Sequence, residues 1–383
     1  MNLCILTSSF PSGSGDVAQA PFLIDFILGL RKWGHRITLF TQDREGGKEP
    51  LLEEVRVRWY PWLKSKKPLA QLNLMNPIDC LRIVTLFYNG RKALLPFLEE
   101  NKINACLALW VVPSGYFANY GYRSIGIPYS LWALGSDIYR YGNNPFLYPV
   151  MNRIVQDAKS VFADGFDLSR RVEERFGRKC SFLATARTIR LEPQELNEPN
   201  KPKKPERPYH FLFVGRLEKV KGIDLLLQSM AHLIEEELDA HLTIVGKGSL
   251  EEWAGNFIHQ QQLERWITLK GNVGDKVLAS LYSSSDCVVI PSRSESIPLV
   301  FSEALNFNKD LIVADVGDMG MLGRQYEVAW VVPPEDPKAL KEMMRKRVNS
   351  KDRGQSLALK KREELKQRFN IETSVERFLA DYV

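Results

Sequence analysis

The feature that most constrains the fold is a regular alternation of short apolar runs with amphipathic segments. The apolar runs are Leu3–Thr7, Arg36–Phe40, Ala105–Trp110, Tyr129–Ala133, Ser160–Ala163, Phe211–Val214, Leu242–Val245, Cys287–Ile290 and Leu311–Ala314. Most of them show no apolar–polar alternation, as expected of strands buried on both faces of a parallel sheet. The intervening segments have a helical period, as in residues 222–238 with one apolar stripe. This alternation predicts βαβ units and doubly wound α/β sheets.

The length of the chain predicts two domains. Its 383 residues exceed the ~250–300 at which a single hydrophobic core stops growing. Residues 191–208 hold five prolines, several charges and almost no apolar side chains, so they favour a linker. We predict an N-terminal domain over 1–192, a linker over 193–209 and a C-terminal domain over 210–366, with a helix at 367–383 returning to the first domain. Hinged α/β domains commonly bind a ligand between them, at the carboxyl ends of their strands.

Composition excludes several classes of protein. Hydrophobic residues make up 44% and charged residues 26%, which is typical of a folded globular chain and excludes a disordered one. No run approaches the ~18 apolar residues of a membrane-spanning helix. Residues 1–10 lack a basic leader and are typical of a strand, so we expect a cytoplasmic protein. The five cysteines include no C-x-x-C pair, which argues against a disulfide framework and a zinc site.

The strongest local signal is residues 291–305, which follow an apolar strand and open a helix. Pro298 suits the first helical turn, and the free amides near Leu299 to Phe301 favour a phosphate or other anion. Glu295 and Glu303 would repel an anion, unless they accept hydrogen bonds from hydroxyl groups. A nucleotide sugar offers both, a diphosphate and hydroxyls. The alternative is that Glu295 caps the helix and Glu303 lies on its solvated face.

Two further signals follow neighbouring strands. At residues 213–227, Gly215 permits a tight exit from the strand, and Arg216 and Lys221 flank a short loop where they can neutralise a diphosphate. Glycine turns at Gly246 and Gly271 let the backbone approach a flat ligand such as a nucleobase. Each glycine turn alone is also ordinary turn chemistry.

Taken in order, these motifs resemble the donor half of glycosyltransferase family 4 over residues 210–345. The matching set is Gly215-Arg216 with Lys221-Gly222, Gly246-x-Gly248, Gly271-x-Val273, Pro291-Ser292-x2-Glu295-x7-Glu303, Gly317-Asp318-Met319 and Val332–Pro337. The resemblance implies a GT-B fold, with two Rossmann-like domains facing a central cleft. It also implies a retaining hexosyltransferase that moves a sugar from a UDP- or GDP-sugar to a hydroxyl acceptor, with no metal or other cofactor.

The resemblance also assigns roles to residues. Arg216 and Lys221 would bind the donor diphosphate, Glu295 the sugar hydroxyls and Glu303 the ribose, while the backbone near Val273 would meet the base. The catalytic set would be Glu295, Arg216, Lys221 and Asp137. The remaining donor-binding positions would be Gly215, Gly246, Ile297, Pro298, Leu299 and Val300. Asp137 is equally suited to a structural hydrogen-bond acceptor.

The N-terminal half resembles the family more loosely. A glycine loop with Gly13, Gly15 and Asp16 would lie on the acceptor side. Its match to a dinucleotide fingerprint is discounted, because it begins well beyond the strand. Three positions depart from the family pattern: Leu134 replaces a histidine, residues 182–192 lack an Asn-Gly-Val-Asp turn, and Ser296-Ile297-Pro298 replaces Gly-Phe-Gly.

These departures leave alternatives open. One is a nucleotide-sugar 2-epimerase of the same fold, although no histidine lies in the loops predicted to line its site. Another is a catalytically degenerate nucleotide-sugar-binding protein, suggested by Leu134. A nicotinamide dehydrogenase is the weakest of the alternatives.

The charge is unevenly divided. Residues 1–190 carry 25 Lys and Arg against 16 Asp and Glu, whereas residues 191–383 carry 27 against 30. Basic and aromatic residues interleave over 56–67, and Arg91 and Lys92 follow. This predicts a peripheral contact with an anionic membrane and a glycan or lipid-linked acceptor, as in polysaccharide or glycolipid biosynthesis. The alternative is a strand followed by a solvated loop. No nucleic-acid-binding module is visible.

Overall fold

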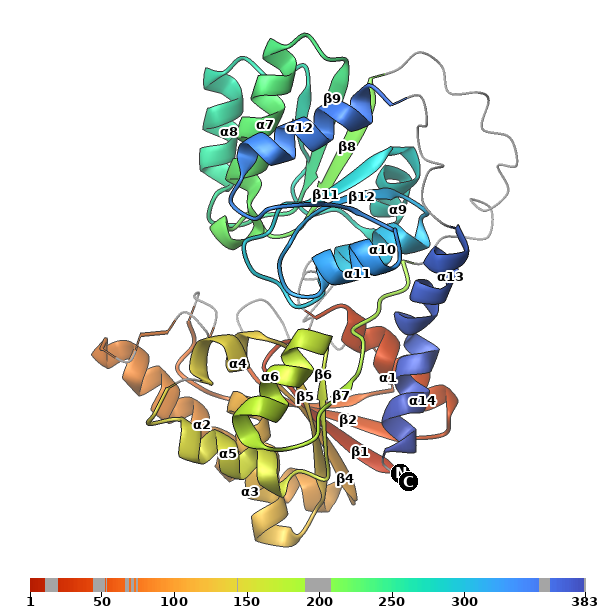
Figure 1. The fold of residues 1–383 in the computed structure, drawn as a ribbon. Coiled ribbons are helices and arrows are strands. Elements are labelled where there is room, and N and C mark those ends of the chain that lie inside the picture. Colours follow the sequence, from red (N-terminus) through yellow and green to blue (C-terminus); the bar gives the residue numbers. More distant parts are fainter. Residues whose placement is uncertain are drawn as a thin grey trace. The chain divides into compact units, whose positions relative to one another are not determined.

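The structure is a computed structural model, which describes residues 1–10, 20–43, 52, 54–65, 69, 72–73, 75–142, 144–189, 208–350 and 359–381. The chain divides into two compact units (Figure 1). Unit 1 comprises Met1–Ala186 with Asn370–Val383, and unit 2 comprises Arg187–Phe369. No helix in the described part of the chain is long and apolar enough to span a membrane.

Unit 1 is built on a seven-stranded sheet in the order β3-β2-β1-β4-β5-β6-β7, with every pair parallel. Its strands are β1 (Asn2–Leu6), β2 (Arg36–Gln42), β3 (Arg56–Tyr60), β4 (Ala105–Leu109), β5 (Tyr129–Ala133), β6 (Ser160–Ala163) and β7 (Ser181–Phe182). Its helices are α1 (Phe22–Lys32), α2 (Pro77–Glu100), the π-helix η2 (Val111–Gly115), α3 (Tyr116–Ile125), α4 (Ser136–Tyr141), α5 (Tyr148–Asp157), α6 (Phe166–Phe176) and α14 (Ile371–Ala380).

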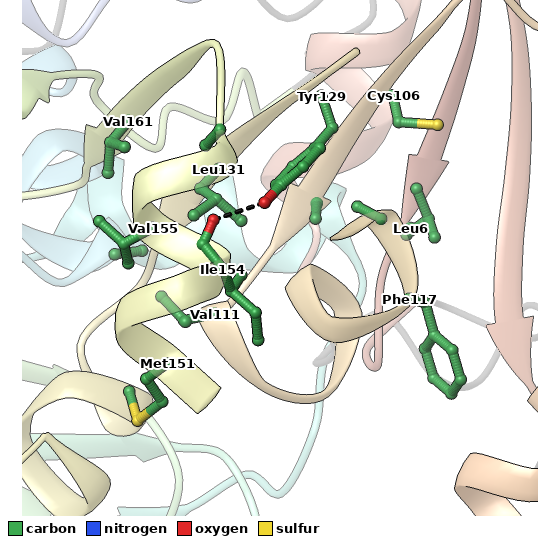
Figure 2. Packing of buried hydrophobic residues seen from close by; sticks show 14 of the residues in the cluster. Leu6, Cys106, Val111, Phe117, Tyr129, Leu131, Met151, Ile154, Val155 and Val161 are labelled. Atoms are coloured by element: carbon green, nitrogen blue, oxygen red, sulfur yellow. Dashed lines mark hydrogen bonds between the residues drawn. The ribbon is translucent and has the colours of Figure 1, made fainter. Parts of the chain in front are cut away.

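The core of unit 1 shows why its strands carry continuous apolar runs. Figure 2 shows Leu131 of β5 and Val161 of β6 packed with Met151 and Val155 of α5. The hydroxyl of Tyr129 is buried among them and donates to the carbonyl oxygen of Ile154 at 2.5 Å. A sheet covered by helices on both faces leaves no polar side for its central strands.

The C-terminal helix α14 belongs to unit 1. The Ser374 hydroxyl donates to the carbonyl oxygen of Ala184 at 3.0 Å, and Phe378 packs edge-on against Phe26 of α1 with ring centroids 5.7 Å apart. Gly29 of α1 is required by this packing, since a Cβ there would lie 2.7 Å from the Val375 side chain. The segment that returns to unit 1 begins at Asn370, whereas the sequence predicts that it begins at residue 367.

Unit 2 is a six-stranded parallel sheet in the order β10-β9-β8-β11-β12-β13. Its strands are β8 (Tyr209–Val214), β9 (Ala240–Val245), β10 (Ile267–Leu269), β11 (Cys287–Ile290), β12 (Asp310–Ala314) and β13 (Trp330–Val332). Its helices are the 3-10 helix η4 (Lys219–Lys221), α7 (Ile223–Glu235), α8 (Glu251–Gln260), α9 (Asp275–Ser284), α10 (Leu299–Asn306), α11 (Met319–Gln325), α12 (Pro337–Val348) and α13 (Leu359–Arg368).

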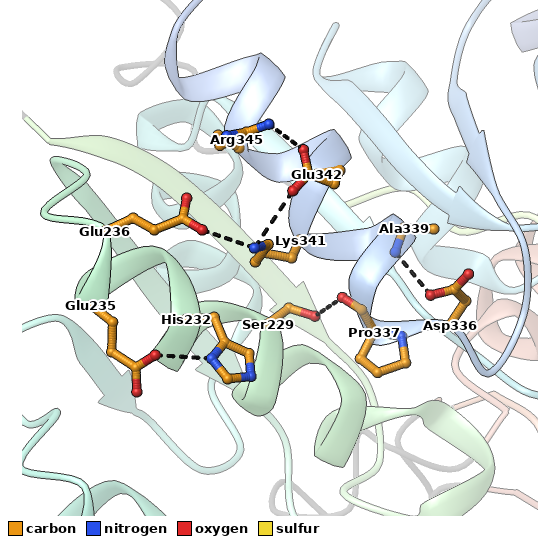
Figure 3. Close-up of polar contacts among 10 residues, drawn as sticks. All are labelled: Ser229, His232, Glu235, Glu236, Asp336, Pro337, Ala339, Lys341, Glu342 and Arg345. Carbon is orange, nitrogen blue, oxygen red and sulfur yellow. Dashed lines mark hydrogen bonds and ion pairs between the residues drawn. The ribbon is translucent and has the colours of Figure 1, made fainter.

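Polar contacts fix α12 against α7 (Figure 3). The Asp336 carboxylate caps α12 by accepting from the Ala339 amide at 2.9 Å. The Ser229 hydroxyl of α7 donates to the Pro337 carbonyl at 3.0 Å, and Lys341 pairs with Glu236 at 2.8 Å. These contacts satisfy the first turn of α12, so its apolar face can bury Leu340 and Met344.

The doubly wound α/β prediction is confirmed in both units, with small differences at the boundaries. Residues 193–207 of the predicted linker, which spans 193–209, lie outside the described residues. Tyr209 is already the first residue of β8, buried and paired with Ala240, so that linker extends one residue too far. Arg187 is the first residue of unit 2, before the predicted boundary at 192, and its guanidinium pairs with Asp275 and Glu303 of that unit.

Candidate functional site

The sheet of unit 2 reverses its winding between β8 and β11. From β8 the chain proceeds outward through β9 and β10, and from β11 it proceeds the other way through β12 and β13. The loops that leave the carboxyl ends of these two adjacent strands therefore diverge and leave room between them, which is where ligands bind in open α/β sheets. Arg216 and Lys221 follow β8, and Ser292 and Glu295 follow β11.

The structure brings Lys221 and Glu295 together. The Lys221 ammonium forms an ion pair with Oε1 of Glu295. The Ser292 hydroxyl donates to the same oxygen at 2.9 Å. Both charged side chains remain partly exposed. Glu295 therefore does not cap α10 and is held as an acceptor at the surface of the loop.

Arg216 supplies a second cation at this edge. It lies between β8 and η4, it is exposed, and its guanidinium pairs with no carboxylate within the described ranges. Because Lys221 and Glu295 neutralise each other, Arg216 adds a positive charge to the loop after β8. This charge favours an anionic group in the ligand.

Arg293 organises both loops, and sequence reasoning missed it. Its guanidinium forms two hydrogen bonds to the Asp224 carboxylate at 2.7 and 2.8 Å, and its backbone amide donates to the Val220 carbonyl at 2.8 Å. The Glu335 carboxylate lies 3.1 Å from the same guanidinium. Arg293 thus ties the Glu295 loop to the segment that carries Lys221. Its position between Ser292 and Glu295 was the available signal, but the motif leaves that position unspecified.

Glycines let these loops approach one another. Gly222, at φ +71°, faces Pro291 so closely that a Cβ would lie 2.0 Å from its carbonyl oxygen. Gly246, at φ +130°, lies equally close to Gly215, since a Cβ at residue 246 would lie 1.9 Å from the Gly215 carbonyl oxygen. A Cβ at Gly215 itself would make only ordinary contact with Phe213 at 3.6 Å, so the packing does not require glycine there. The close approach requires glycine at 246.

The start of α10 differs from the prediction by one position. Pro298 is the N-cap, with an extended backbone at ψ 146°, and the helix begins at Leu299. The Phe301 amide donates to the Pro298 carbonyl at 2.9 Å, so it is not free. In the described part of the chain the amides of Leu299 and Val300 have no acceptor. Ile297 and Val300 bury their side chains. The backbone amides of Leu299 and Val300 are the groups at this helix start that could donate to an anion.

Glu303 is buried, so its placement on a solvated helix face is wrong. The Tyr282 hydroxyl donates to its Oε2 at 2.7 Å, and Arg187 lies 3.5 Å from its Oε1. Burial raises the pKa of Glu303, and the Arg187 charge opposes that rise. Arg187 also pairs with Asp275 at the start of α9. Arg187 falls in the segment that departs from the family pattern, and that departure supplies a partner for Glu303.

The predicted base-contacting loop lies beside the Gly246 turn. The Gly246 amide donates to the Gly271 carbonyl at 2.8 Å. Val273 follows in the same loop and is partly exposed just before α9. The two glycine turns therefore form one continuous edge at the ends of β9 and β10, adjacent in the sheet to β8.

Asp137 lies in unit 1 and is buried. Its Oδ2 accepts from the Val111 amide at 2.6 Å, and Oδ1 has no hydrogen-bond partner in the described part of the chain. Burial raises the pKa of Asp137 to about 6. This geometry is that of a structural acceptor, which supports the start of η2 after β4. Gly13, Gly15 and Asp16, predicted for the acceptor side, lie outside the described residues.

Comparison with known proteins bears on both sequence and fold. The profile of the family described as glycosyl transferases group 1 matches residues 194–368. An uncharacterised glycosyltransferase of Methanocaldococcus jannaschii is 33% identical over 123 residues, which cover 32% of this chain and 31% of that protein. The chain thus matches about a third of the length of such relatives.

Solved structures match the whole chain. Sucrose-phosphate synthase from Thermosynechococcus elongatus gives a TM-score of 0.76 at 17% identity, covering 100% of this chain and 98% of that one. The Anabaena protein HepE in complex with UDP-glucose gives 0.71 at 16% identity, covering 99% of each chain. At such identities the likeness shows the fold, which is GT-B. Residues 194–368, which make up less than half of the chain, are thus similar in sequence to the group 1 glycosyltransferases.

Proposed function

We propose that the protein transfers a hexosyl group from a nucleotide-diphosphate sugar to a hydroxyl acceptor, with retention of configuration. The observation that carries the proposal is the Lys221–Glu295 ion pair at the winding reversal of unit 2, with Arg216 on the same loop as Lys221. Cations for a diphosphate and a carboxylate for sugar hydroxyls are thereby held on adjacent loops.

On donor binding, Lys221 would exchange the Glu295 carboxylate for the donor diphosphate. Without donor, Lys221 neutralises Glu295. A diphosphate carries more negative charge than a carboxylate and competes for the ammonium, with Arg216 and the Leu299 and Val300 amides as further donors. Glu295 is then released to accept hydrogen bonds from the sugar hydroxyls. The Ser292 hydroxyl keeps the carboxylate in place during the exchange.

The chemical step then needs stabilisation of the leaving group. The bond from the anomeric carbon to the diphosphate oxygen breaks, and the acceptor oxygen bonds to that carbon on the same face. The departing phosphate oxygen takes the acceptor's proton, so no strong protein base is required. Lys221 and Arg216 stabilise the charge that develops on the diphosphate, which is the main electrostatic contribution. We propose that these cations take the part that a metal ion plays in other transferases.

The donor and acceptor are proposed at the level of chemical class. UDP-sugars are the first donors to test, because HepE was solved with UDP-glucose and shares this fold. The basic N-terminal half supports a glycan or lipid-linked acceptor at the cytoplasmic face of a membrane, in polysaccharide or glycolipid synthesis.

A thermal-shift screen against UDP, GDP, ADP and their sugars tests the proposal. A ligand that binds only the folded chain raises the melting temperature, so one nucleotide series is expected to do so. Nuclear magnetic resonance of the product then reports the anomeric configuration. Isomerised sugar from donor alone would indicate an epimerase instead. Binding without hydrolysis or transfer across a broad acceptor panel would indicate a binding protein, as Leu134 suggests.

A further inference from the structure

Helix α2 of unit 1 carries an apolar face that the described residues of that unit leave exposed. Ile78, Leu81, Val84 and Tyr88 are 57, 53, 61 and 67% exposed. Their spacing of three and four residues places them on one side of the helix. In Figure 1, α2 is the long orange helix of unit 1. Several large apolar side chains exposed side by side on one helix face indicate a contact with a partner or a membrane.

The apolar surface continues beyond α2. Phe87, the chain neighbour of Tyr88, lines an apolar cavity of about 210 Å³ together with Val112, Leu147 and Val150. Val150 is itself 44% exposed, and Phe146, next to Leu147, is 88% exposed. On the other side, the Leu63 amide donates to the Thr85 hydroxyl of α2 at 3.0 Å, which places exposed Leu63 beside the helix.

The charges beside this face are positive. Arg91 and Lys92 follow the apolar stripe on α2 and are exposed. The one acidic residue in α2 before Glu99 is Asp79, which is buried and paired with Arg82 at 2.7 Å. The described face therefore combines apolar and cationic side chains with no exposed carboxylate on α2 between residues 77 and 98.

We propose that this face of α2, with Leu63, Phe146 and Val150, docks onto an anionic lipid bilayer. Apolar side chains would enter the boundary between headgroups and acyl chains, while Arg91 and Lys92 meet lipid phosphates. A second copy of this chain is a poorer occupant, because two such faces would bring like charges together. The surface shares Leu63, Arg91 and Lys92 with the basic region predicted from sequence, and the structure adds the exposed apolar side chains of α2.

Co-sedimentation of the full chain with vesicles tests the proposal. Vesicles of phosphatidylcholine alone and of phosphatidylcholine mixed with phosphatidylglycerol are compared at low and high salt. We expect binding to the anionic vesicles, weakened by salt. The variant Arg91→Gln/Lys92→Gln is expected to reduce binding about thirtyfold. The variant Leu81→Ser/Tyr88→Ser is expected to reduce it about tenfold or more.

Two controls show whether any loss of vesicle binding is specific to the α2 face and independent of nucleotide binding. Val277→Ser/Met321→Ser removes exposed apolar side chains of unit 2 and is expected to bind vesicles as the parent chain does. Nucleotide binding by the α2 variants is expected to remain unchanged, so failure of this proposal and failure of the proposed reaction are distinguishable. Equal vesicle binding by parent and α2 variants would overturn the proposal. A solution dimer that the α2 variants dissociate, without lipid binding, would assign the face to self-association instead.

Discussion

The carboxyl edges of the two sheets hold their charged groups in opposite ways. In unit 2, Lys221 and Glu295 stand on loops, paired with each other and partly exposed. In unit 1, Asp137 lies buried beneath the edge and accepts a backbone amide. Both carboxylates follow a strand and both belong to the predicted catalytic set. A carboxylate that meets a ligand needs a partner it can exchange, whereas one that holds the backbone does not.

Removing either member of the exposed pair gives the largest expected effect. We expect Lys221→Ala and Glu295→Ala each to lower kcat by about 10²–10³-fold, because a charge aimed at the reacting groups is lost. Lys219→Ala is the matched control, since Lys219 is an exposed lysine of the same 3-10 helix. Steady-state kinetics with unchanged circular dichroism checks this. Near-parent turnover by both Ala variants would contradict a role of Lys221 and Glu295 in the reaction.

Replacing Arg293, which holds the loops of Lys221 and Glu295 together, gives the next largest expected loss of activity. Arg293→Met removes the ties to Asp224 and Glu335 and is expected to lower kcat/KM by about tenfold to a hundredfold, because misplaced loops lose their alignment. Arg293→Lys should restore part of the activity but not the two-point contact with Asp224. Arg324→Met is the control, since it breaks an exposed two-point Arg–Asp contact elsewhere in unit 2. Equal loss in both Met variants would contradict a positioning role.

The buried carboxylate of unit 1 predicts an effect on stability. Asp137→Asn keeps an acceptor for the Val111 amide, so turnover is expected to persist, whereas Asp137→Ala leaves that amide unpaired and costs about 1–3 kcal/mol in the free energy of unfolding. If Asp137→Asn instead abolished turnover in a folded protein, Asp137 would be a participant in the reaction.

The pH dependence follows from the same residue. Because the pKa of Asp137 rises from 3.8 to about 6 on folding, the folded chain binds more protons between these values. Its contribution to stability is therefore lost as pH rises from about 4 to 6, by an amount on the order of 3 kcal/mol. The parent chain should lose stability relative to Asp137→Asn across this window in urea unfolding. Parallel curves for the two proteins would contradict the buried, protonated state.

The smallest expected effect is that of metal removal. Lys221 and Arg216 are proposed to offset the diphosphate charge, so EDTA is expected to leave turnover unchanged. Assays in EDTA, with and without excess Mg²⁺, measure this directly. A loss restored by Mg²⁺ would assign part of the diphosphate charge to a cation.

The fold and the positions of the loops that carry Lys221 and Glu295 were largely predictable, because both depend on local patterns. Uninterrupted apolar runs predict strands buried on both faces, and those strands are present. The sequence placed Lys221 and Glu295 at one edge of the sheet, because both follow buried parallel strands, and the structure adds that they form an ion pair.

The partners of charged residues could not be predicted in the same way. Glu303 is a charged residue in a short helix, and its burial depends on Tyr282 and Arg187, which are distant in the chain. Arg293 occupies an unspecified position of its motif, and its importance appears only when Asp224 and Glu335 are brought to it. The apolar face of α2 was missed for a related reason, because only the folded unit shows which side of a helix is left uncovered.

Calorimetric titration of nucleoside diphosphate and nucleoside monophosphate into the parent chain, Lys221→Ala and Lys219→Ala tests the central claim most directly. The account predicts that Lys221→Ala loses diphosphate affinity by about tenfold or more, while monophosphate binding and the Lys219→Ala control stay near the parent values. Parent-like diphosphate binding by Lys221→Ala would contradict the account.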